Sequence, residues 1–311
     1  MRTLPLFAIL LAGCTGDVGP CDPAPRWQLA LPANPQLAVA NDGSLTIWGS
    51  DQLQRVDGDG RVTASIAIAM SNGGPSIGVD RAGAPVIALC NFIDGTGAIT
   101  VYDTALAPQR TLSTPVCVGH IARGPAGQLA YTAGSTTTTT QVHALDAAGV
   151  ELWAVTIDGR LDYAANGNVV VYDLQLPDLH RVELAGATGA IVSDVLLPIE
   201  PLVFTLFAPD GSYVVRSYDR TDPVGVIRRD ATGAAVWERP LRSLLGVAVL
   251  ASDNSVVVTA DIATSVVRLD GSTGATIATT THCTSGTTLV GATADAYLLH
   301  STGLLSSYPG P

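Results

Sequence analysis

The sequence contains no lysine, so all 16 of its basic residues are arginine, and they are outnumbered by 27 acidic residues. With a formal net charge of −11, the chain lacks the clustered cations that neutralise a phosphate backbone, and we expect no nucleic-acid partner. The absence of lysine also excludes Schiff-base chemistry through an amine side chain. No run of 18 or more apolar residues occurs, so we expect no transmembrane helix.

Three sequence patterns that bind metal ions or haem are also absent. The sequence has no Cys-x-x-Cys pair, no His-Glu-x-x-His and no Cys-x-x-Cys-His. Cys117 with His120, and His282 with Cys283, could each form half of a metal site, but disulfide cysteines beside loop histidines are the commoner arrangement. We therefore expect no cofactor, no metal site and no catalytic residue.

Turn residues followed by short apolar, β-rich runs recur along the chain. One ladder of turns repeats every 40 to 44 residues, at Gly43, Gly83, Gly127, Gly167, Gly211, Asn254 and Ala296. Glycine and asparagine suit the left-handed backbone of tight hairpins. A second ladder, from Asp57 to Asp270, runs in phase with the first. Two hairpin turns per repeat give four strands per repeat, which is the period of a β-propeller blade.

The two ends of the repeat region predict how the ring closes. The repeat that begins at Thr287 lacks an outermost strand, whereas the segment from Arg26 to Leu31 matches the outermost strands of other repeats. This segment would complete the last blade and remove both sheet edges. We predict an all-β fold: one seven-bladed propeller over residues 26–311, with six continuous blades and a seventh closed by the N-terminal strand.

The first residues predict export and a lipid anchor. Arg2 precedes the apolar stretch from Leu4 to Leu11, which is too short to span a bilayer and is typical of a signal peptide. Residues 11–14 (Leu-Ala-Gly-Cys) resemble the lipobox of bacterial lipoproteins, which implies cleavage after residue 13 and lipidation of Cys14. Residues 14–25 would then form a lipidated linker. Thr15 is not the aspartate that retains such proteins in the inner membrane, which favours the outer membrane, with the lipid as the only membrane contact.

The segments D-A-T-G-A-A-V-W at Asp230 and D-G-S-T-G-A-T-I at Asp270 resemble PQQ-like repeat proteins. Trp27, Trp153 and Trp237 occupy the outer-strand position expected for this family. The combination of anchor and repeat also resembles the lipoprotein propellers of the outer-membrane β-barrel assembly machinery. The PQQ-binding members have a vicinal cysteine pair that is missing here, so the resemblance does not imply a cofactor.

Four cysteines remain after Cys14 is lipidated, and an oxidising compartment permits two disulfides. They are Cys21, Cys90, Cys117 and Cys283, which allow three connectivities. Pairing Cys21 with Cys283 would join the two sides of the ring seam, and we state it as a hypothesis.

One face of the propeller is predicted to be a binding surface. Loops between second and third strands vary in length, while the turns on the opposite face stay nearly constant, and variable loops on a constant scaffold are where recognition is found. The charged residues predicted on this face are Asp94, His120, Arg160, Asp173, Asp178, Asp219, Asp222 and Asp261. These aspartates could alternatively serve only to organise turns.

The function expected from these features is a non-catalytic, monomeric scaffold of the cell envelope that binds a protein or a glycan through one propeller face. The alternative is an envelope enzyme, a glycan hydrolase or lyase, with two or more carboxylates converging at the propeller mouth.

Overall fold

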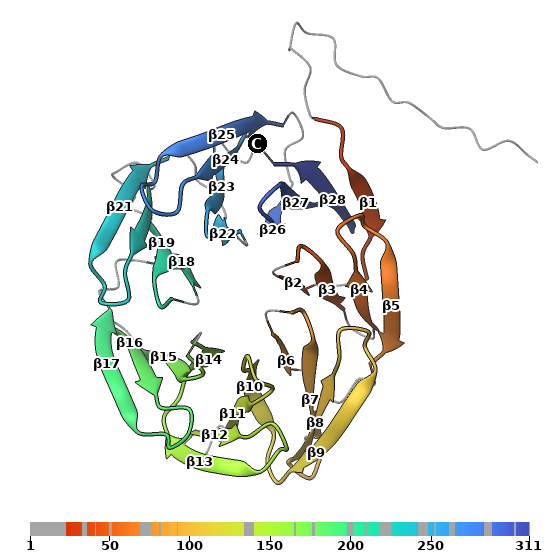
Figure 1. The fold of residues 1–311 in the computed structure, drawn as a ribbon, viewed down its shortest axis with the longest axis vertical. Coiled ribbons are helices and arrows are strands. Elements are labelled where there is room, and N and C mark those ends of the chain that lie inside the picture. Colours follow the sequence, from red (N-terminus) through yellow and green to blue (C-terminus); the bar gives the residue numbers. More distant parts are fainter. Residues whose placement is uncertain are drawn as a thin grey trace, which may run out of the picture.

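The computed structural model describes residues 23–310, with gaps at 33–35, 41, 50–51, 69–75, 81, 92, 134–139, 165, 176–177, 198–201, 209, 218–224, 242–247, 252, 261–264, 283–287 and 302. The described residues form 28 strands in seven four-stranded antiparallel sheets arranged as a ring (Figure 1). The predicted all-β, seven-bladed propeller is therefore confirmed. Among these residues, no segment is a helix of the length and hydrophobicity needed to cross a membrane.

Each blade runs from an innermost strand beside the channel to an outermost strand at the rim. The first blade contains β2 (Gln36–Val39), β3 (Leu45–Trp48), β4 (Gln52–Val56) and β5 (Val62–Ala67). The second contains β6 (Ser76–Val79), β7 (Pro85–Asn91), β8 (Thr96–Tyr102) and β9 (Pro108–Thr114). The third contains β10 (Val118–Arg123), β11 (Leu129–Ala133), β12 (Gln141–Leu145) and β13 (Glu151–Thr156). The fourth blade contains β14 (Arg160–Tyr163), β15 (Val169–Gln175), β16 (Asp178–Leu184) and β17 (Ile191–Leu197). The fifth contains β18 (Leu202–Phe207), β19 (Tyr213–Ser217), β20 (Gly225–Arg229) and β21 (Ala235–Pro240). The sixth contains β22 (Ala248–Leu250), β23 (Val256–Ala260), β24 (Ser265–Leu269) and β25 (Thr276–Thr281).

The seventh blade joins the two ends of the chain. It contains β26 (Thr288–Ala292), β27 (Ala296–Ser301) and β28 (Leu304–Pro309), and its outermost strand is β1 (Trp27–Ala30) from the N-terminal side. β1 pairs antiparallel with β28, with Trp27 opposite Ser307 and Ala30 opposite Leu304. The predicted closing strand is thus in place, and it covers the free edge that β28 would otherwise expose.

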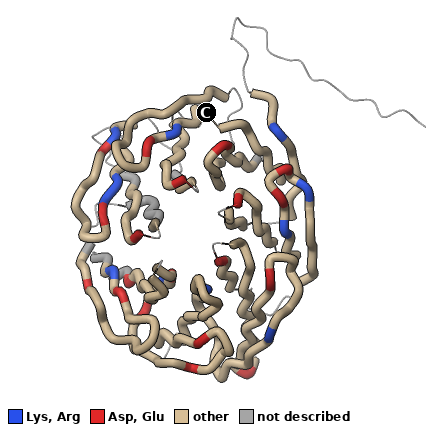
Figure 2. The backbone as a smooth tube through the Cα atoms, in the orientation of Figure 1, with Lys and Arg blue, Asp and Glu red and all other residues tan. Residues whose placement is uncertain are grey.

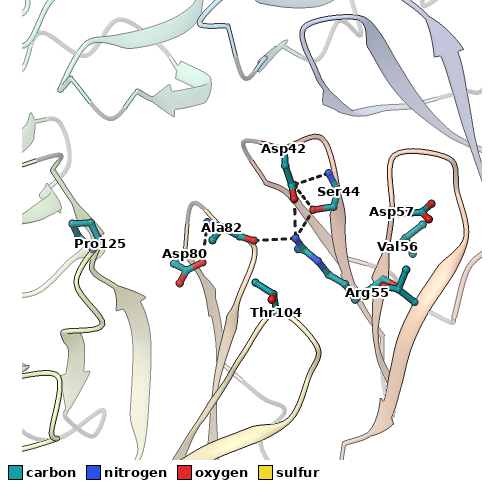
Figure 3. A pocket seen from close by; sticks show the side chains of 10 residues that line it. Asp42, Ser44, Arg55, Val56, Asp57, Asp80, Ala82, Thr104 and Pro125 are labelled. Carbon is teal, nitrogen blue, oxygen red and sulfur yellow. Dashed lines mark hydrogen bonds and ion pairs between the residues drawn. The ribbon is translucent and has the colours of Figure 1, made fainter.

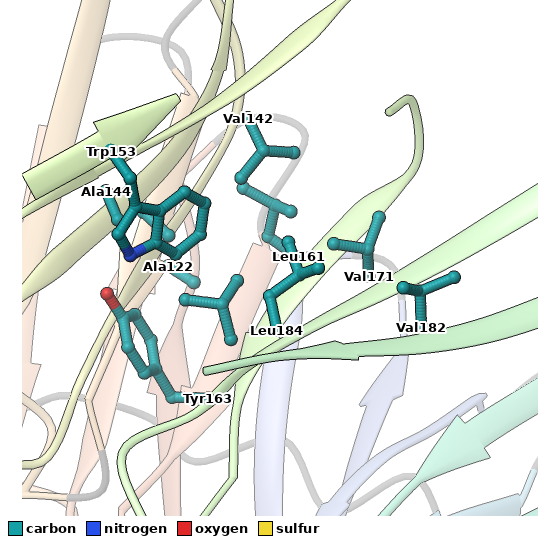
Figure 4. Close-up of a cluster of buried hydrophobic side chains, with 11 residues drawn as sticks. Ala122, Val142, Ala144, Trp153, Leu161, Tyr163, Val171, Val182 and Leu184 are labelled. Carbon is teal, nitrogen blue, oxygen red and sulfur yellow. The ribbon is translucent and has the colours of Figure 1, made fainter. Parts of the chain in front are cut away.

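The core lies between neighbouring blades and is divided among them. One cluster of buried side chains joins the third and fourth blades, with Trp153, Tyr163 and Leu184 packed against valines from both sheets (Figure 4). The second and third strands of a blade are covered on both faces, which explains their continuous apolar runs. Val169, Val170 and Val171 in β15 are all at most 3% exposed.

Tryptophans on outermost strands fasten each of three blades to the next blade. Each indole N–H donates over 2.9 Å to a carbonyl in the next blade's turn between third and fourth strands: Trp27 to Gly58, Trp153 to Gly186 and Trp237 to Gly271. In the second blade, Leu112 takes the equivalent place beside Gly149 of the third blade. An aliphatic side chain thus replaces the indole where tryptophan is missing, without the hydrogen bond.

Candidate functional site: the two faces of the channel

The two faces of the ring differ in construction. One face, the loop face, carries the loops between second and third strands and the connections between blades. The other, the turn face, carries the tight turns that join first to second and third to fourth strands. The central channel runs between them. A first strand starts at the loop face and ends at the turn face, so residues at its start lie near the loop-face mouth.

A cavity of about 640 Å³ occupies the channel beside the first four blades. Its wall comes from the first strands β2, β6, β10 and β14, together with Trp48 at the loop-face end of β3. Two residues predicted for the binding face, His120 and Arg160, both line this cavity. The structure therefore brings these two residues together, on adjacent blades.

Four polar residues lie at the same height in the cavity wall. In each of the first four blades, one residue of the first strand pairs with the first residue of the second strand. The polar residue of the layer stands three positions before that first-strand residue. These polar residues are Gln36, Ser76, His120 and Arg160. This layer contains two basic side chains and no carboxylate. Among the described residues, neither the His120 nor the Arg160 side chain forms a hydrogen bond or ion pair, and both residues are exposed.

The charged side chains deeper in the cavity form hydrogen bonds or ion pairs with other residues. The carboxylate of Asp162, two residues beyond Arg160, accepts a hydrogen bond from the backbone N–H of Tyr163 at 2.7 Å. At the turn-face end, Arg123 lies 3.2 Å from Asp80 and donates to the Tyr102 carbonyl at 2.7 Å.

Ser76 lies in a sequence with the pattern of a hydrolase nucleophile elbow. Gly74 to Gly78 spell Gly-x-Ser-x-Gly, a pattern whose chemistry requires a strand–turn–helix context. Ser76 instead begins β6, and its hydroxyl donates to the carbonyl of Gly119. His120 and Asp162 line the same cavity, but no hydrogen bond joins Ser76 to His120 or His120 to Asp162 among the described residues. The three side chains do not form a catalytic triad in this structure.

The turn face holds a second cavity of about 680 Å³ at the junction of the first and second blades (Figure 3). Arg55 reaches into it from β4 and is only 5% exposed. Its guanidinium donates to the Ser44 and Thr46 hydroxyls within its own blade, and to the carbonyls of Ala82 and Gly83 in the next blade. The arginine therefore ties two neighbouring turns together.

This arrangement recurs in the fifth and sixth blades. Each set comprises a turn aspartate, a serine two residues later and a buried arginine on the third strand: Asp42, Ser44 and Arg55; Asp210, Ser212 and Arg228; Asp253, Ser255 and Arg268. Each arginine also donates to a backbone carbonyl in the next blade, that of Gly83, Asn254 or Thr293. We call these three sets the turn staples.

The turn staples keep their carboxylates ionised. A hydrogen bond from the Ser44 hydroxyl lowers the pKa of Asp42. For Asp253, burial acts against ionisation, but hydrogen bonds from Ser255 and the charge of Arg268 outweigh it, so its pKa lies below the usual range. The pKa of all three turn-staple aspartates is thus lowered, whereas a general acid at neutral pH needs a raised pKa.

The other predicted binding residues divide into three groups. Asp94 is exposed on the loop face and organises its own loop, accepting hydrogen bonds from the N–H and hydroxyl of Thr96 at 2.9 and 2.6 Å. Asp173 lies near the loop-face end of β15, and Asp178 begins β16. Asp219, Asp222 and Asp261 fall outside the described residues, as do Cys14, Cys21 and Cys283.

One disulfide joins Cys90, on β7, to Cys117 in the connection to the third blade, with 4.9 Å between their Cα atoms. This bond lies on the loop face and links two blades. The hypothesis that Cys21 pairs with Cys283 concerns residues outside the described part of the chain. Within that part, no group of three or more histidine, cysteine, aspartate and glutamate residues could hold a metal ion.

The turn staples are the feature that sequence reasoning missed. The serines of Asp-Gly-Ser and Asp-Asn-Ser turns, and the arginines at the end of third strands, were each visible as parts of the two turn ladders. Their separation varies with the length of the intervening loop, from 11 residues between Ser44 and Arg55 to 16 between Ser212 and Arg228, which hides the pairing.

No protein-family model and no curated protein sequence matches the chain. Solved structures similar to it include BamB from Moraxella catarrhalis, with a TM-score of 0.55 and 13% identity over 92% of this chain and 99% of that one. The chain shares the β-propeller fold with this protein. Hydrazine synthase from Kuenenia stuttgartiensis is also similar (TM-score 0.60, 12% identity, 96% and 99% covered). So is the β-propeller domain of Cps50 (Swd1) from Myceliophteria thermophila (TM-score 0.59, 10% identity, 92% and 100% covered). At these identities the likeness concerns the fold alone.

Proposed function

We propose that the chain is a non-catalytic scaffold of the bacterial cell envelope that binds a protein or a glycan through the loop face of its propeller. In this proposal, residues 1–13 are a signal peptide and Cys14 carries the lipid that holds a monomeric propeller at the outer membrane. The lipobox-like sequence supports the anchor, and the construction of the loop face supports binding.

The observation that carries the proposal is the loop between β7 and β8. At its tip Ile93 is 85% exposed, the highest value among the large apolar side chains of the described residues. Its backbone N–H donates to the Asn91 side chain, whose amide donates in turn to Asp94 at 2.9 Å. The disulfide at Cys90 fixes the base of this loop. Residues that are held by hydrogen bonds before binding lose little conformational entropy when a partner covers them, which favours an exposed apolar anchor such as Ile93.

The engagement of the carboxylates supports a non-catalytic role. Hydrolysis of a glycan requires a pair of carboxyl groups free to act as acid and as base or nucleophile. The aspartates of the turn-face cavity instead accept hydrogen bonds from their own turns. Asp57 and Asp80 each accept two from backbone N–H groups, and Asp42 binds Ser44.

The test is chemical crosslinking in intact envelopes, followed by purification of the tagged chain. We expect one reproducible partner whose recovery falls at least fivefold in Ile93→Ser. The control is Ile277→Ser, which removes an apolar side chain that is 53% exposed from the outer rim of the sixth blade. Equal recovery from the two variants, or no partner at all, would contradict binding through the loop face.

The enzyme alternative is tested on the same purified chain. Incubation with a panel of envelope glycans and with a p-nitrophenyl ester should give no turnover above that of the buffer. Turnover that disappears in Ser76→Ala would instead make the channel cavity an active site and would overturn the proposal.

A further inference from the structure

We propose that the loop-face mouth of the channel binds an oxyanion, a carboxylate or phosphate group, between Arg160 and His120. The inference deepens the proposed function, on which it rests, by naming the chemistry that the loop face recognises. An acidic side chain of a partner protein or a free small acid could supply this group, and the experiment below separates the two sources.

The first support is the layer of side chains at the mouth. Gln36, Ser76, His120 and Arg160 stand at one height on four successive first strands and line one cavity. Strand pairing fixes the backbone at Gln36, Ser76 and Arg160. His120 instead lies at an irregularity of β10, where its backbone N–H donates to the Thr132 hydroxyl at 2.7 Å. The cavity of about 640 Å³ is within the size range of small-ligand sites.

The second support is that the side chains of Arg160 and His120 have no hydrogen-bond or ion-pair partner among the described residues. Elsewhere in the described structure the arginines of the channel and turn staples are committed, as Arg123 is to Asp80 and Arg55 to its two turns. Arg160 and His120 have no hydrogen bond or ion pair with any described residue. The planar guanidinium of an arginine can donate two parallel hydrogen bonds to a carboxylate or phosphate, which gives such a site its preference for oxyanions.

The third support is the distribution of charge along the channel. The turns that border its turn-face mouth carry aspartates at one equivalent position in four blades, Asp42, Asp210, Asp253 and Asp295. Acidic residues lie at the channel-facing ends of several blades in Figure 2. At the loop-face mouth, by contrast, the layer of side chains in the cavity wall holds Arg160 and His120, and the carboxylate of Asp162 lies deeper in the same cavity. An anion that enters from the loop face therefore meets the Arg160 guanidinium before it meets a carboxylate of the described cavity wall.

The wall also suggests the shape of the ligand. Trp48, which pairs with Gln36 across β2 and β3, lines the cavity beside the polar layer, as do Leu37 and Ile77. A ligand that places its oxyanion at Arg160 can therefore pack an apolar or flat part against this side of the channel.

The experiment measures binding of three probes to the purified chain by isothermal titration calorimetry: inorganic phosphate, citrate and a hexaglutamate peptide. We expect at least one probe to bind the wild type, and its Kd to rise about tenfold or more in Arg160→Gln and in His120→Gln. The matched control is Arg61→Gln, which removes the same charge from an arginine whose side chain is 79% exposed on the turn face. Its Kd should stay within about twofold.

Each outcome decides a specific point. Binding of hexaglutamate alone assigns the site to an acidic protein segment, and binding of citrate or phosphate alone assigns it to a free acid. No binding of any probe, or equal weakening by Arg61→Gln, would overturn the inference. Because Ile93-dependent crosslinking is measured separately, the inference can fail while the proposed function stands, and the reverse is also distinguishable. Unchanged thermal unfolding of the exposed Arg160 and His120 variants excludes misfolding as the cause.

Discussion

At the scale of single residues, the buried arginines of the turn staples join neighbouring blades by hydrogen bonds. Arg268 is 3% exposed and donates to the Ser255 hydroxyl and the Asp253 carboxylate of its own blade, at 2.9 Å each. It also donates to the Thr293 carbonyl of the next blade at 3.0 Å. One side chain thus satisfies acceptors on both sides of a blade interface.

Replacing this arginine should therefore weaken the ring. We predict that Arg268→Met lowers the free energy of unfolding by about 2–3 kcal/mol, because the three acceptors lose their donor. The control Arg61→Met, at an exposed position, should change it by less than about 0.5 kcal/mol. Urea unfolding followed by tryptophan fluorescence measures the free energy of unfolding of both variants. Equal effects would show that the buried arginine stabilises the fold no more than the exposed one does.

The turn aspartates predict how stability depends on pH. Hydrogen bonds from Ser272 and Thr273 lower the pKa of Asp270 to about 2. Since the folded-state pKa lies below that of the unfolded chain, the stabilisation is complete above the ordinary aspartate pKa and is lost as the pH falls through about 4 towards 2. Asp42, Asp210 and Asp253 shift in the same direction.

Asp270→Asn should consequently reduce the loss of stability that occurs as the pH falls from about 4 towards 2. We expect its urea midpoint to lie below that of the wild type at pH 6 and to approach it at pH 2.5. Asp59→Asn is the control, since this exposed carboxylate accepts no hydrogen bond from another described residue. A wild-type midpoint that stays constant from pH 6 to pH 2.5 would refute the assignment.

At the scale of elements, the contacts between blades depend on glycines that lie beneath large side chains. Gly274 has a φ of +67°, and a Cβ there would come within 2.7–2.9 Å of the Trp237 ring. Gly95 has a similar φ of +75°, with nothing within 4 Å of the equivalent point. Substitution of alanine at Gly95 measures the cost of the left-handed backbone alone, whereas the same substitution at Gly274 adds steric overlap with Trp237.

We predict that Gly274→Ala destabilises the protein by about 1–3 kcal/mol more than Gly95→Ala does. Both alanines pay for left-handed backbone, but only the first must displace an indole that fills its site. Thermal unfolding of the two variants gives the comparison. Equal melting temperatures would mean that the Trp237 contact is loose.

The strands themselves were predictable from sequence, whereas the contacts between blades were only partly so. Turn residues at a constant period, with apolar runs between them, fix strand number and order because both signals are local. The outermost-strand position of the tryptophans was predictable too, because Trp153 and Trp237 each follow closely after a turn of the second ladder. The pairing of Ser212 with Arg228, and the gathering of His120 and Arg160 in one cavity, depend on loop lengths and on the closed ring, and neither is a local property.

At the scale of the whole molecule, β1 closes the ring. It covers the edge of β28, and Trp27 donates to the Gly58 carbonyl of the first blade, so the seventh blade is held on both sides. Without β1 the described ring would have an unpaired strand edge and an unfilled place beside Gly60.

We predict that deletion of residues 1–32 produces soluble aggregates and broadens thermal unfolding, because an exposed strand edge pairs with other chains. Deleting only residues 1–22 leaves β1 in place and should give a single sharp transition without such aggregates. Size-exclusion chromatography with light scattering distinguishes the two. A monomeric, sharply unfolding 1–32 deletion would contradict closure by β1.

Site-specific photocrosslinking in intact envelopes determines whether a partner binds through the loop face. A photoreactive amino acid is placed at position 93 on the loop face, at position 59 on the turn face or at position 277 on the outer rim. All three positions are exposed. We expect one strong crosslinked product from position 93 and little from the other two. A product from position 59 or 277, with none from position 93, would contradict it.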